Sequence, residues 1–119
     1  MFIPRPPQIP ARHRPRGFTI LHEDPDLLVI NKDPGLLTMS LHRDQAATAE
    51  ALLTRYLRKG NSASRHRAWL VHRLDRETSG LLVFAKSERI QETLKGQWET
   101  TRKFYLAAVH GCPDPKQGE

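Results

Sequence analysis

Residues 72–86 read HRLDRETSGLLVFAK, and more about the architecture of the chain follows from them than from any other segment. A dense cluster of polar groups leads through a turn-like Thr-Ser-Gly into the apolar run of residues 81–85, which predicts a buried strand. Two arginines, Arg73 and Arg76, flank Asp75 and favour its ionised form, which can act as a nucleophile or a general base. An ordinary turn with solvated arginines is the alternative, and the residue types alone favour it.

Two other kinds of site share parts of this pattern and are excluded by their remaining requirements. A protein-kinase catalytic loop needs His-Arg-Asp and a later magnesium-binding Asn, but Leu74 separates Arg73 from Asp75 and no Asn follows. His72 and Asp75 have the spacing of metal ligands on one helical turn, yet the surrounding sequence is not helical and supplies no third ligand. The stretch therefore predicts neither a kinase nor a metal site.

Strands are predicted on both sides of this stretch from short runs of apolar and β-branched residues. The first two are joined across a segment rich in Asp, Glu and Pro, which is typical of a turn. The predicted strands cover residues 19–22, 27–31, 69–71, 81–85 and 103–110.

Two helices are predicted from apolar residues three and four positions apart. The second follows a capping Ser87 and should bury Ile90, Leu94 and Trp98. Because hairpin-like strands alternate with helices, the sequence predicts an α+β fold with a mixed, largely antiparallel sheet and flanking helices. The first helix covers residues 46–58, with an apolar stripe of Ala46, Ala49, Leu52, Leu53, Tyr56 and Leu57.

The positive charge of the chain is unevenly distributed. The 119 residues have a formal net charge of +6 and a pI of about 10.0. Residues 1–17 contain four arginines and no acid, and residues 55–76 contain seven Lys or Arg against Asp75 alone. Clustered cations favour a polyanionic partner, because phosphate neutralisation rewards concentrated Lys and Arg. The alternative is that these clustered charges only keep the chain soluble, as a charged tail and a charged surface.

Length and composition bound the remaining possibilities. A chain of 119 residues, 38% of them hydrophobic, suffices for one domain. No apolar run approaches the ~18 residues of a membrane-spanning helix. Residues 1–17, rich in Pro and Arg, predict a disordered arm and lack the apolar region of a secretory signal. The single cysteine, Cys112, excludes an internal disulfide framework and a multi-cysteine zinc site. We therefore expect no membrane association and a soluble, reducing compartment, the cytoplasm.

Four segments together resemble one known family. Residues 72–86 closely resemble the signature of the RluA-type pseudouridine synthases, HRLD-x-x-TSG followed by a hydrophobic run and Ala-Lys. The resemblance implies that residues 18–119 are a partial catalytic domain of that fold, after the arm at residues 1–17. In one further segment, Asp33 and Pro34 are transposed relative to the order usual in the family. The further segments are similar to an opening hairpin, an N-K-P-x-G segment and a K-x-Y-x-A-x-V-x-G strand, at residues 20–32, 31–36 and 103–111.

The resemblance implies isomerisation of uridine to pseudouridine in ribosomal or transfer RNA, without a cofactor. By match of motif, Asp75 would be the catalytic aspartate and would attack the sugar or the base, or first act as a base. Arg73 would enter the RNA stack and help hold out the target nucleotide, because chemistry at a stacked base requires extrusion. Tyr105 would stack on the uracil ring, the alternative being a tyrosine in the core of a strand.

The resemblance also implies a wider set of RNA contacts. Lys32 and Lys86 either contact backbone phosphates or support the fold. The full set expected to bind RNA is Arg73, Tyr105, His72, Arg76, Thr78, Lys32, Arg65 and Arg67.

One part of the family pattern does not occur in the 119 residues. In the family, a later G-R-x-H-Q motif supplies a basic residue that pairs with the catalytic aspartate, and no such motif follows residue 112 here. We therefore expect the chain to be the amino-terminal part of a synthase, marginally stable and inactive until the missing half of the domain is supplied. Two alternatives stay open: an inactive RNA-binding remnant of a synthase, and a small interaction domain with no role on RNA.

Overall fold

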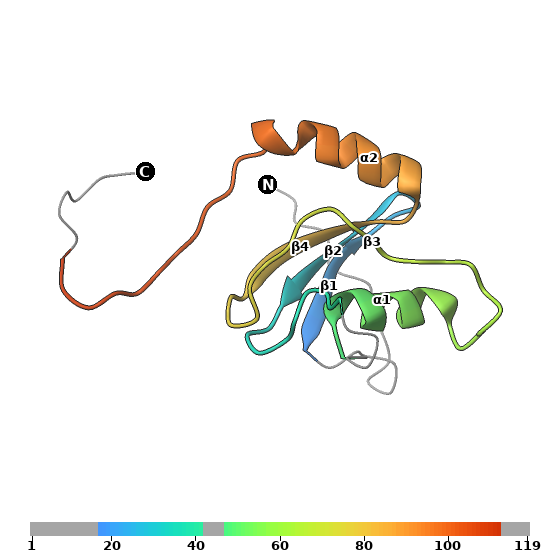
Figure 1. Cartoon of the computed structure of the whole chain (residues 1–119), viewed down its shortest axis with the longest axis horizontal. Coiled ribbons are helices and arrows are strands. Elements are labelled where there is room, and N and C mark those ends of the chain that lie inside the picture. Colours follow the sequence, from blue (N-terminus) through green and yellow to red (C-terminus); the bar gives the residue numbers. More distant parts are fainter. Residues whose placement is uncertain (1–16, 42–46, 113–119) are drawn as a thin grey trace.

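The computed structural model describes residues 17–41 and 47–112, so the arm predicted at residues 1–17 lies outside the described residues except for Gly17. Four strands form one antiparallel sheet in the order β1-β2-β4-β3. Figure 1 shows helices α1 (Ala49–Arg58) and α2 (Glu88–Gln97) on opposite sides of this sheet. The predicted α+β class is confirmed. The strands are β1 (Phe18–Glu23), β2 (Leu27–Lys32), β3 (Trp69–Leu70) and β4 (Gly80–Ala85).

The turn between β1 and β2 forms because Asp24 satisfies the backbone that reverses there. Its carboxylate accepts hydrogen bonds from the backbone N–H groups of Asp26 and Leu27, at 2.8 and 2.9 Å. His22 adds a third contact, from Nε2 at 2.7 Å. The hydrogen bond from His22, followed by those from the backbone, lowers the pKa of Asp24 to about 2. This turn fixes the register in which β1 and β2 pair.

The core lies on one face of the sheet, under α1. Alternate residues of the three long strands point to this face and are almost fully buried, as the period of two requires. Ala49 and Leu53 of α1 are fully buried against them, and Thr48 caps the helix by accepting a hydrogen bond from the backbone of Ala51. The first predicted helix is thus confirmed from Ala49 on, while Ala46 of its predicted apolar stripe lies outside the described residues. The buried strand residues are Phe18, Ile20, Leu28, Ile30, Leu82 and Phe84.

The other face of the sheet is covered less completely. Helix α2 begins after Ser87, as predicted, and Ser87 accepts a hydrogen bond from the backbone of Ile90. No residue of α2 is fully buried, however, and the face predicted from Ile90, Leu94 and Trp98 is only half-buried. The reason is that the sheet face opposite α1 extends beyond this single helix, and Leu81 of β4 stays 62% exposed.

The strand predicted at residues 103–110 is absent from the structure. Residues 101–112 run as an extended segment away from the sheet after the short 3-10 helix η2 (Trp98–Thr100) (Figure 1). Phe104 is 89% exposed and Leu106 is fully exposed. An apolar segment becomes a strand only where a neighbouring strand pairs with its backbone, and no described strand lies beside this segment. The apolar pattern therefore predicted a strand at residues 103–110, but none of the described strands pairs with this segment.

A polar cluster ties together the far ends of β1, α1 and β4. The carboxylate of Glu23 accepts hydrogen bonds from Tyr56 Oη at 2.8 Å and from Lys86 Nζ at 2.7 Å. Burial raises the pKa of Glu23, but the bonds from Lys86 and Tyr56 outweigh it, and the net shift is downward. Burial, followed by the hydrogen bond to Glu23, raises the pKa of Tyr56 to about 12. Of the two roles considered for Lys86, this structure places it in support of the fold.

The raised pKa of Tyr56 predicts a loss of stability at alkaline pH. The unfolded chain releases the tyrosine proton near pH 10 and the folded chain near pH 12, so folding favours the neutral hydroxyl. The contribution of Tyr56 is therefore complete below pH 10 and disappears as the pH rises to about 12. We expect Tyr56→Phe to lower the free energy of unfolding by about 1 kcal/mol at pH 8 and by much less at pH 11.5.

Urea unfolding of both proteins at several pH values, followed by tryptophan fluorescence, measures this difference. A gap between wild type and Tyr56→Phe that stays constant from pH 8 to pH 11.5 would contradict the assignment.

Candidate functional site

The loop of residues 72–80 connects β3 to β4 and carries the polar cluster that the sequence singles out. The hydroxyl of Thr38 makes two hydrogen bonds to the backbone of this loop. It donates to the carbonyl oxygen of Leu74 at 2.7 Å and accepts from the N–H of Leu74 at 3.1 Å. Both Thr38 and Leu74 are buried, at 2% and 7% exposure. The backbone one residue before Asp75 is therefore fixed by both of its polar groups.

Lys32 fixes the backbone on the other side of Asp75. This last residue of β2 is fully buried, and its Nζ donates to the carbonyl oxygens of Asp33, Leu36 and Arg76 at 2.9, 2.8 and 2.9 Å. All three N–H groups of the ammonium are satisfied, so Lys32 joins the 33–36 turn to the 72–80 loop. The structure thus places Lys32 in support of the fold and leaves it no surface for a phosphate.

The electrostatics of Lys32 link it to the loop above. Burial lowers the pKa of Lys32, while the carboxylates of Glu77, Asp33 and Asp75 oppose that shift. The desolvated ammonium of Lys32 therefore interacts electrostatically with the carboxylate of Asp75. Gly35, in the same turn, has φ +96° and donates its N–H to the carbonyl oxygen of Arg76 at 2.8 Å.

The side chains on the outer side of the loop are open to solvent. Arg73, Asp75 and Arg76 are exposed, and Thr78 is half-buried, with its N–H donating to the carbonyl oxygen of Asp75 at 3.1 Å. Within residues 17–41 and 47–112, no hydrogen bond or ion pair engages the carboxylate of Asp75. A carboxylate that is carried on rigid backbone and makes no hydrogen bond or ion pair with the described residues is available to a ligand.

His72 takes part in the fold at the start of the same loop. Its Nε2 accepts a hydrogen bond from the N–H of Val83 at 3.0 Å, and its ring stacks on Trp98 with centroids 4.3 Å apart. Burial, followed by the charge of Lys103, lowers the pKa of His72. An accepting Nε2 requires the neutral imidazole with its proton on Nδ1. His72 thus replaces a ladder partner of β4, and Val83 and Trp98 hold its ring within the fold.

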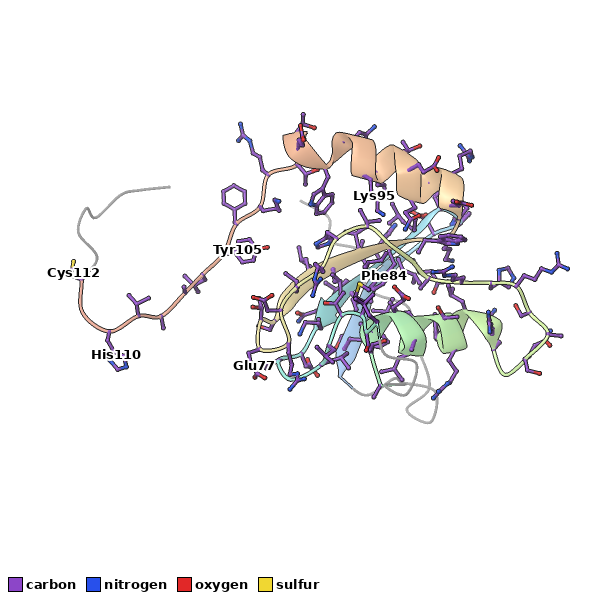
Figure 2. The ribbon with its side chains drawn as sticks, viewed as in Figure 1. Glu77, Phe84, Lys95, Tyr105, His110 and Cys112 are labelled. Carbon is purple, nitrogen blue, oxygen red and sulfur yellow. The ribbon has the colours of Figure 1, made fainter. Side chains whose placement is uncertain are left out.

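The remaining predicted residues lie away from this loop. Arg65 and Arg67 lie in the segment after α1, where the Arg67 guanidinium stacks over the Trp69 ring, 4.4 Å from its centroid. Figure 2 shows Tyr105 on the extended segment after α2, 68% exposed. It makes no hydrogen bond, ion pair or ring contact with residues 72–80 in the described part of the chain.

Thr38 is the residue that sequence reasoning missed, and its role can be tested directly. Thr38→Val keeps the shape of the side chain but leaves the N–H and carbonyl oxygen of Leu74 unpaired in a buried place. We expect it to lower the free energy of unfolding by about 2 kcal/mol. Thr38→Ser keeps the hydroxyl and should lose less than half of that. Urea unfolding of the two variants measures the difference, and equal midpoints for Val and Ser would show that the hydroxyl does not hold the loop.

No cluster of three or more His, Cys, Asp or Glu side chains in the described residues could hold a metal ion. No helix among the same residues is long and apolar enough to cross a membrane.

Comparison with known proteins gives one consistent result. The sequence profile of the RNA pseudouridylate synthases matches residues 26–119. An uncharacterized RNA pseudouridine synthase of Mycoplasma genitalium is 39% identical over 93 residues, which cover 76% of this chain and 28% of that protein. The dual-specificity RNA pseudouridine synthase RluA of Salmonella typhimurium is 34% identical over 115 residues, which cover 95% of this chain and 47% of that protein.

A solved structure agrees with these sequence matches. Human RNA pseudouridylate synthase domain containing 4 superposes with a TM-score of 0.55 at 28% identity, over 68% of this chain and 29% of that one. The chain thus spans between about a quarter and a half of the length of the relatives that it matches.

Proposed function

Because the chain belongs to the RNA pseudouridylate synthase family, we propose that it serves the isomerisation of uridine to pseudouridine in RNA, with Asp75 as the catalytic residue. The observation that carries this proposal is the position of Asp75. It is the exposed acid between two exposed arginines, on a loop that Thr38 and Lys32 hold rigid from below. Such a loop presents one carboxylate at a fixed point to a flexible polyanion.

The chemistry of the reaction fits a single carboxylate. The bond from N1 of the base to C1′ of the ribose breaks, the base turns, and C5 forms a new bond to the same C1′. N1 gains a proton and C5 releases one, so the reaction is an isomerisation without net oxidation. Asp75 can attack C1′ or the uracil ring, or act first as a base, and each of these needs its ionised, unpartnered form.

The arginines beside Asp75 are proposed to hold the RNA. Arg73 would occupy the place of the extruded nucleotide in the stack, because the target base must leave the helix before its glycosidic bond can react. Arg76 and Thr78 would contact the neighbouring backbone. Tyr105, whose ring is exposed, would stack on the uracil once the extended segment that carries it folds over the loop.

The extent of the active unit is part of the proposal. The chain spans less than half of its matched relatives, so we propose that the active domain also contains a region equivalent to the remainder of those proteins. Its substrate would be ribosomal or transfer RNA in the cytoplasm. The alternative function is RNA binding without catalysis, as an inactive remnant.

Unmodified transcripts of ribosomal and transfer RNA test the proposal. The chain is incubated with them alone, and also fused to the region of the Salmonella relative that follows the matched segment. We expect RNA binding from both proteins, measured by filter retention, and pseudouridine from the completed domain, measured by nucleoside chromatography. Binding without pseudouridine in both cases would establish the remnant, and the absence of both would refute a role on RNA.

A further inference from the structure

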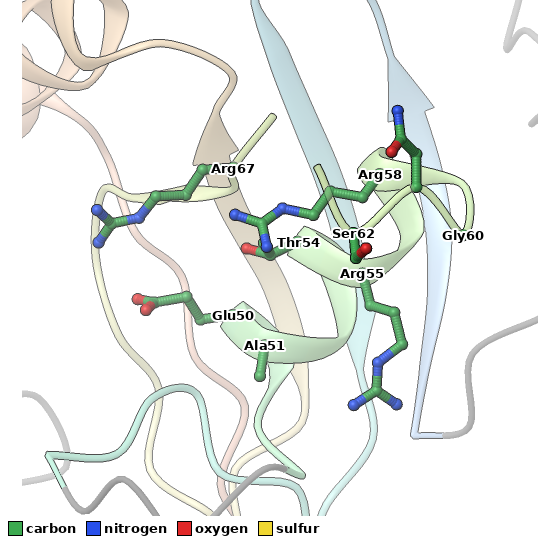
Figure 3. A pocket seen from close by; sticks show the side chains of 9 residues that line it. Glu50, Ala51, Thr54, Arg55, Arg58, Gly60, Ser62 and Arg67 are labelled. Atoms are coloured by element: carbon green, nitrogen blue, oxygen red, sulfur yellow. The ribbon is translucent and has the colours of Figure 1, made fainter. Parts of the chain in front are cut away.

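A cleft of about 700 Å³ lies along the outer side of α1, opposite the segment of residues 60–67 (Figure 3). Three arginines contribute to its lining, Arg55 and Arg58 from the helix and Arg67 from the segment that follows it. Among the described residues that line it, Glu50 is the only acid, so these residues carry a formal charge of +2, from three cations and one anion. Neither Asp75 nor any other residue of the 72–80 loop lines this cleft.

Two of the three guanidinium groups are held in place. Arg58 donates from Nε to the carbonyl oxygen of His66 at 3.0 Å, which leaves its terminal nitrogens unused by that bond. Arg67 stacks on Trp69. Figure 3 shows the side chains of Arg58 and Arg67 extending in the same direction, to the left of the view, whereas Arg55 points toward the bottom of the view. Arginines that are ordered before binding lose less side-chain entropy when an anion arrives.

No described residue forms an ion pair with the arginines of the cleft. In residues 17–41 and 47–112 the ion pairs are His22 with Asp24 and Lys86 with Glu23, and neither includes an arginine of the cleft. Thr54 and Ser62 add hydroxyl groups to the lining. A concave surface with unpaired guanidinium groups concentrates anions, and planar guanidinium groups match phosphate oxygens in geometry.

The cleft also has a defined position relative to the candidate catalytic loop. The N–H groups of Ala49 and Glu50, at the start of α1, donate to the carbonyl oxygens of Leu37 and Thr38 at 2.8 and 3.0 Å. Thr38 in turn holds Leu74, the neighbour of Asp75. From that point the residues of α1 that line the cleft, Glu50 to Arg58, span about 12 Å along the helix, a distance that an RNA strand covers in a few nucleotides.

We propose that this cleft binds phosphodiester groups of the RNA strand that carries the target uridine, at a distance of several nucleotides from Asp75. The inference rests on the proposed RNA substrate and adds a second contact, independent of base identity, outside the 72–80 loop. Arg58 and Arg67 hold one phosphate group or two adjacent ones, and Arg55 extends the track along the helix. The cleft thereby fixes how the strand crosses the domain while the loop acts on one nucleotide.

The test is the salt dependence of RNA binding by the full chain. A fluorescently labelled single-stranded RNA is titrated with wild type and with the double variant Arg58→Gln/Arg67→Gln. Loss of two phosphate contacts should reduce the slope of log K against log salt by about 1.4 and weaken binding about 10- to 100-fold at low salt. Arg89→Gln, on α2, removes one charge away from the cleft and serves as the control, with a slope change below about 0.3. Urea unfolding of each variant verifies that it is folded.

A second variant separates charge from general damage to the site. Arg58→Lys/Arg67→Lys keeps both charges and should retain most of the salt slope. An unchanged slope and affinity in the Gln double variant, or no RNA binding by wild type, would overturn the inference. Inorganic phosphate carries the same anionic oxygens as an RNA phosphodiester and could occupy the cleft instead. A cleft that binds phosphate, with RNA binding insensitive to Arg58 and Arg67, would be a site for free anions and would also overturn it.

The outcome is independent of catalysis. Asp75→Asn should keep the full salt slope, because the cleft does not include Asp75. A slope that depends on Arg58 and Arg67, together with no pseudouridine formation by any form of the protein, would leave the cleft established and refute the synthase proposal alone.

Discussion

Replacement of Lys32 by Met should lower the free energy of unfolding by about 3–5 kcal/mol. Its ammonium donates to three carbonyl oxygens in a fully buried position, and methionine fills a similar volume without donating to any of them. Removal of the ammonium leaves buried acceptors unsatisfied in both the 33–36 turn and the 72–80 loop. A loss of this size is a large part of the 5–15 kcal/mol that typically stabilises a domain.

The matched control is Lys86→Met. Lys86 is also a lysine at the end of a strand, but its ammonium pairs with one carboxylate at a partly exposed position. We expect that substitution to lower the free energy of unfolding by about 1 kcal/mol. Urea unfolding followed by the fluorescence of the two tryptophans measures both variants. A Lys32→Met protein that unfolds at the same urea concentration as Lys86→Met would show that the buried ammonium does not hold the loop.

The strands of the hairpin and helix α1 could be predicted because their signals are local. Turn residues mark the hairpin, and an apolar stripe at spacings of three and four marks α1. Leu53 and Phe84 become buried because each belongs to such a stripe or apolar run. The α+β class then follows from the order of the elements.

The supports of the candidate site could not be predicted, because they depend on residues that are distant in sequence. A lysine is ordinarily a surface residue, and nothing near Lys32 in the sequence indicates that its ammonium donates to the carbonyl oxygen of Arg76, 44 positions later. Thr38 meets Leu74 across 36 positions, in a segment without periodicity. Only the folded backbone brings these groups together.

The prediction for residues 103–110 was wrong for the opposite reason. Its apolar residues, such as Phe104 and Leu106, give a clear local signal for a strand. A strand also requires a partner, and partners are not encoded locally. The contacts of His72 with Val83 and Trp98 show the same limit, because they too join residues that are not neighbours in the sequence.

Asp75→Asn should reduce pseudouridine formation by at least about 10³-fold in any active form of the protein. Asparagine has the shape of aspartate and cannot act as a nucleophile or a base. RNA affinity should stay within about twofold of wild type, because the arginines proposed to contact phosphates are unchanged. Glu77→Gln is the matched control, since it removes the same charge from an exposed position on the same loop, and it should keep most of the activity.

The most direct test of the central claim, that Asp75 performs the reaction, is the release of tritium from RNA labelled at C5 of uracil. The new bond at C5 expels the hydrogen carried there, so each turnover transfers one label to water. The completed domain and its Glu77→Gln variant should release tritium at similar rates, and Asp75→Asn should release none above RNA alone. Release by Asp75→Asn at the wild-type rate, or no release by the completed wild-type domain, would contradict the claim.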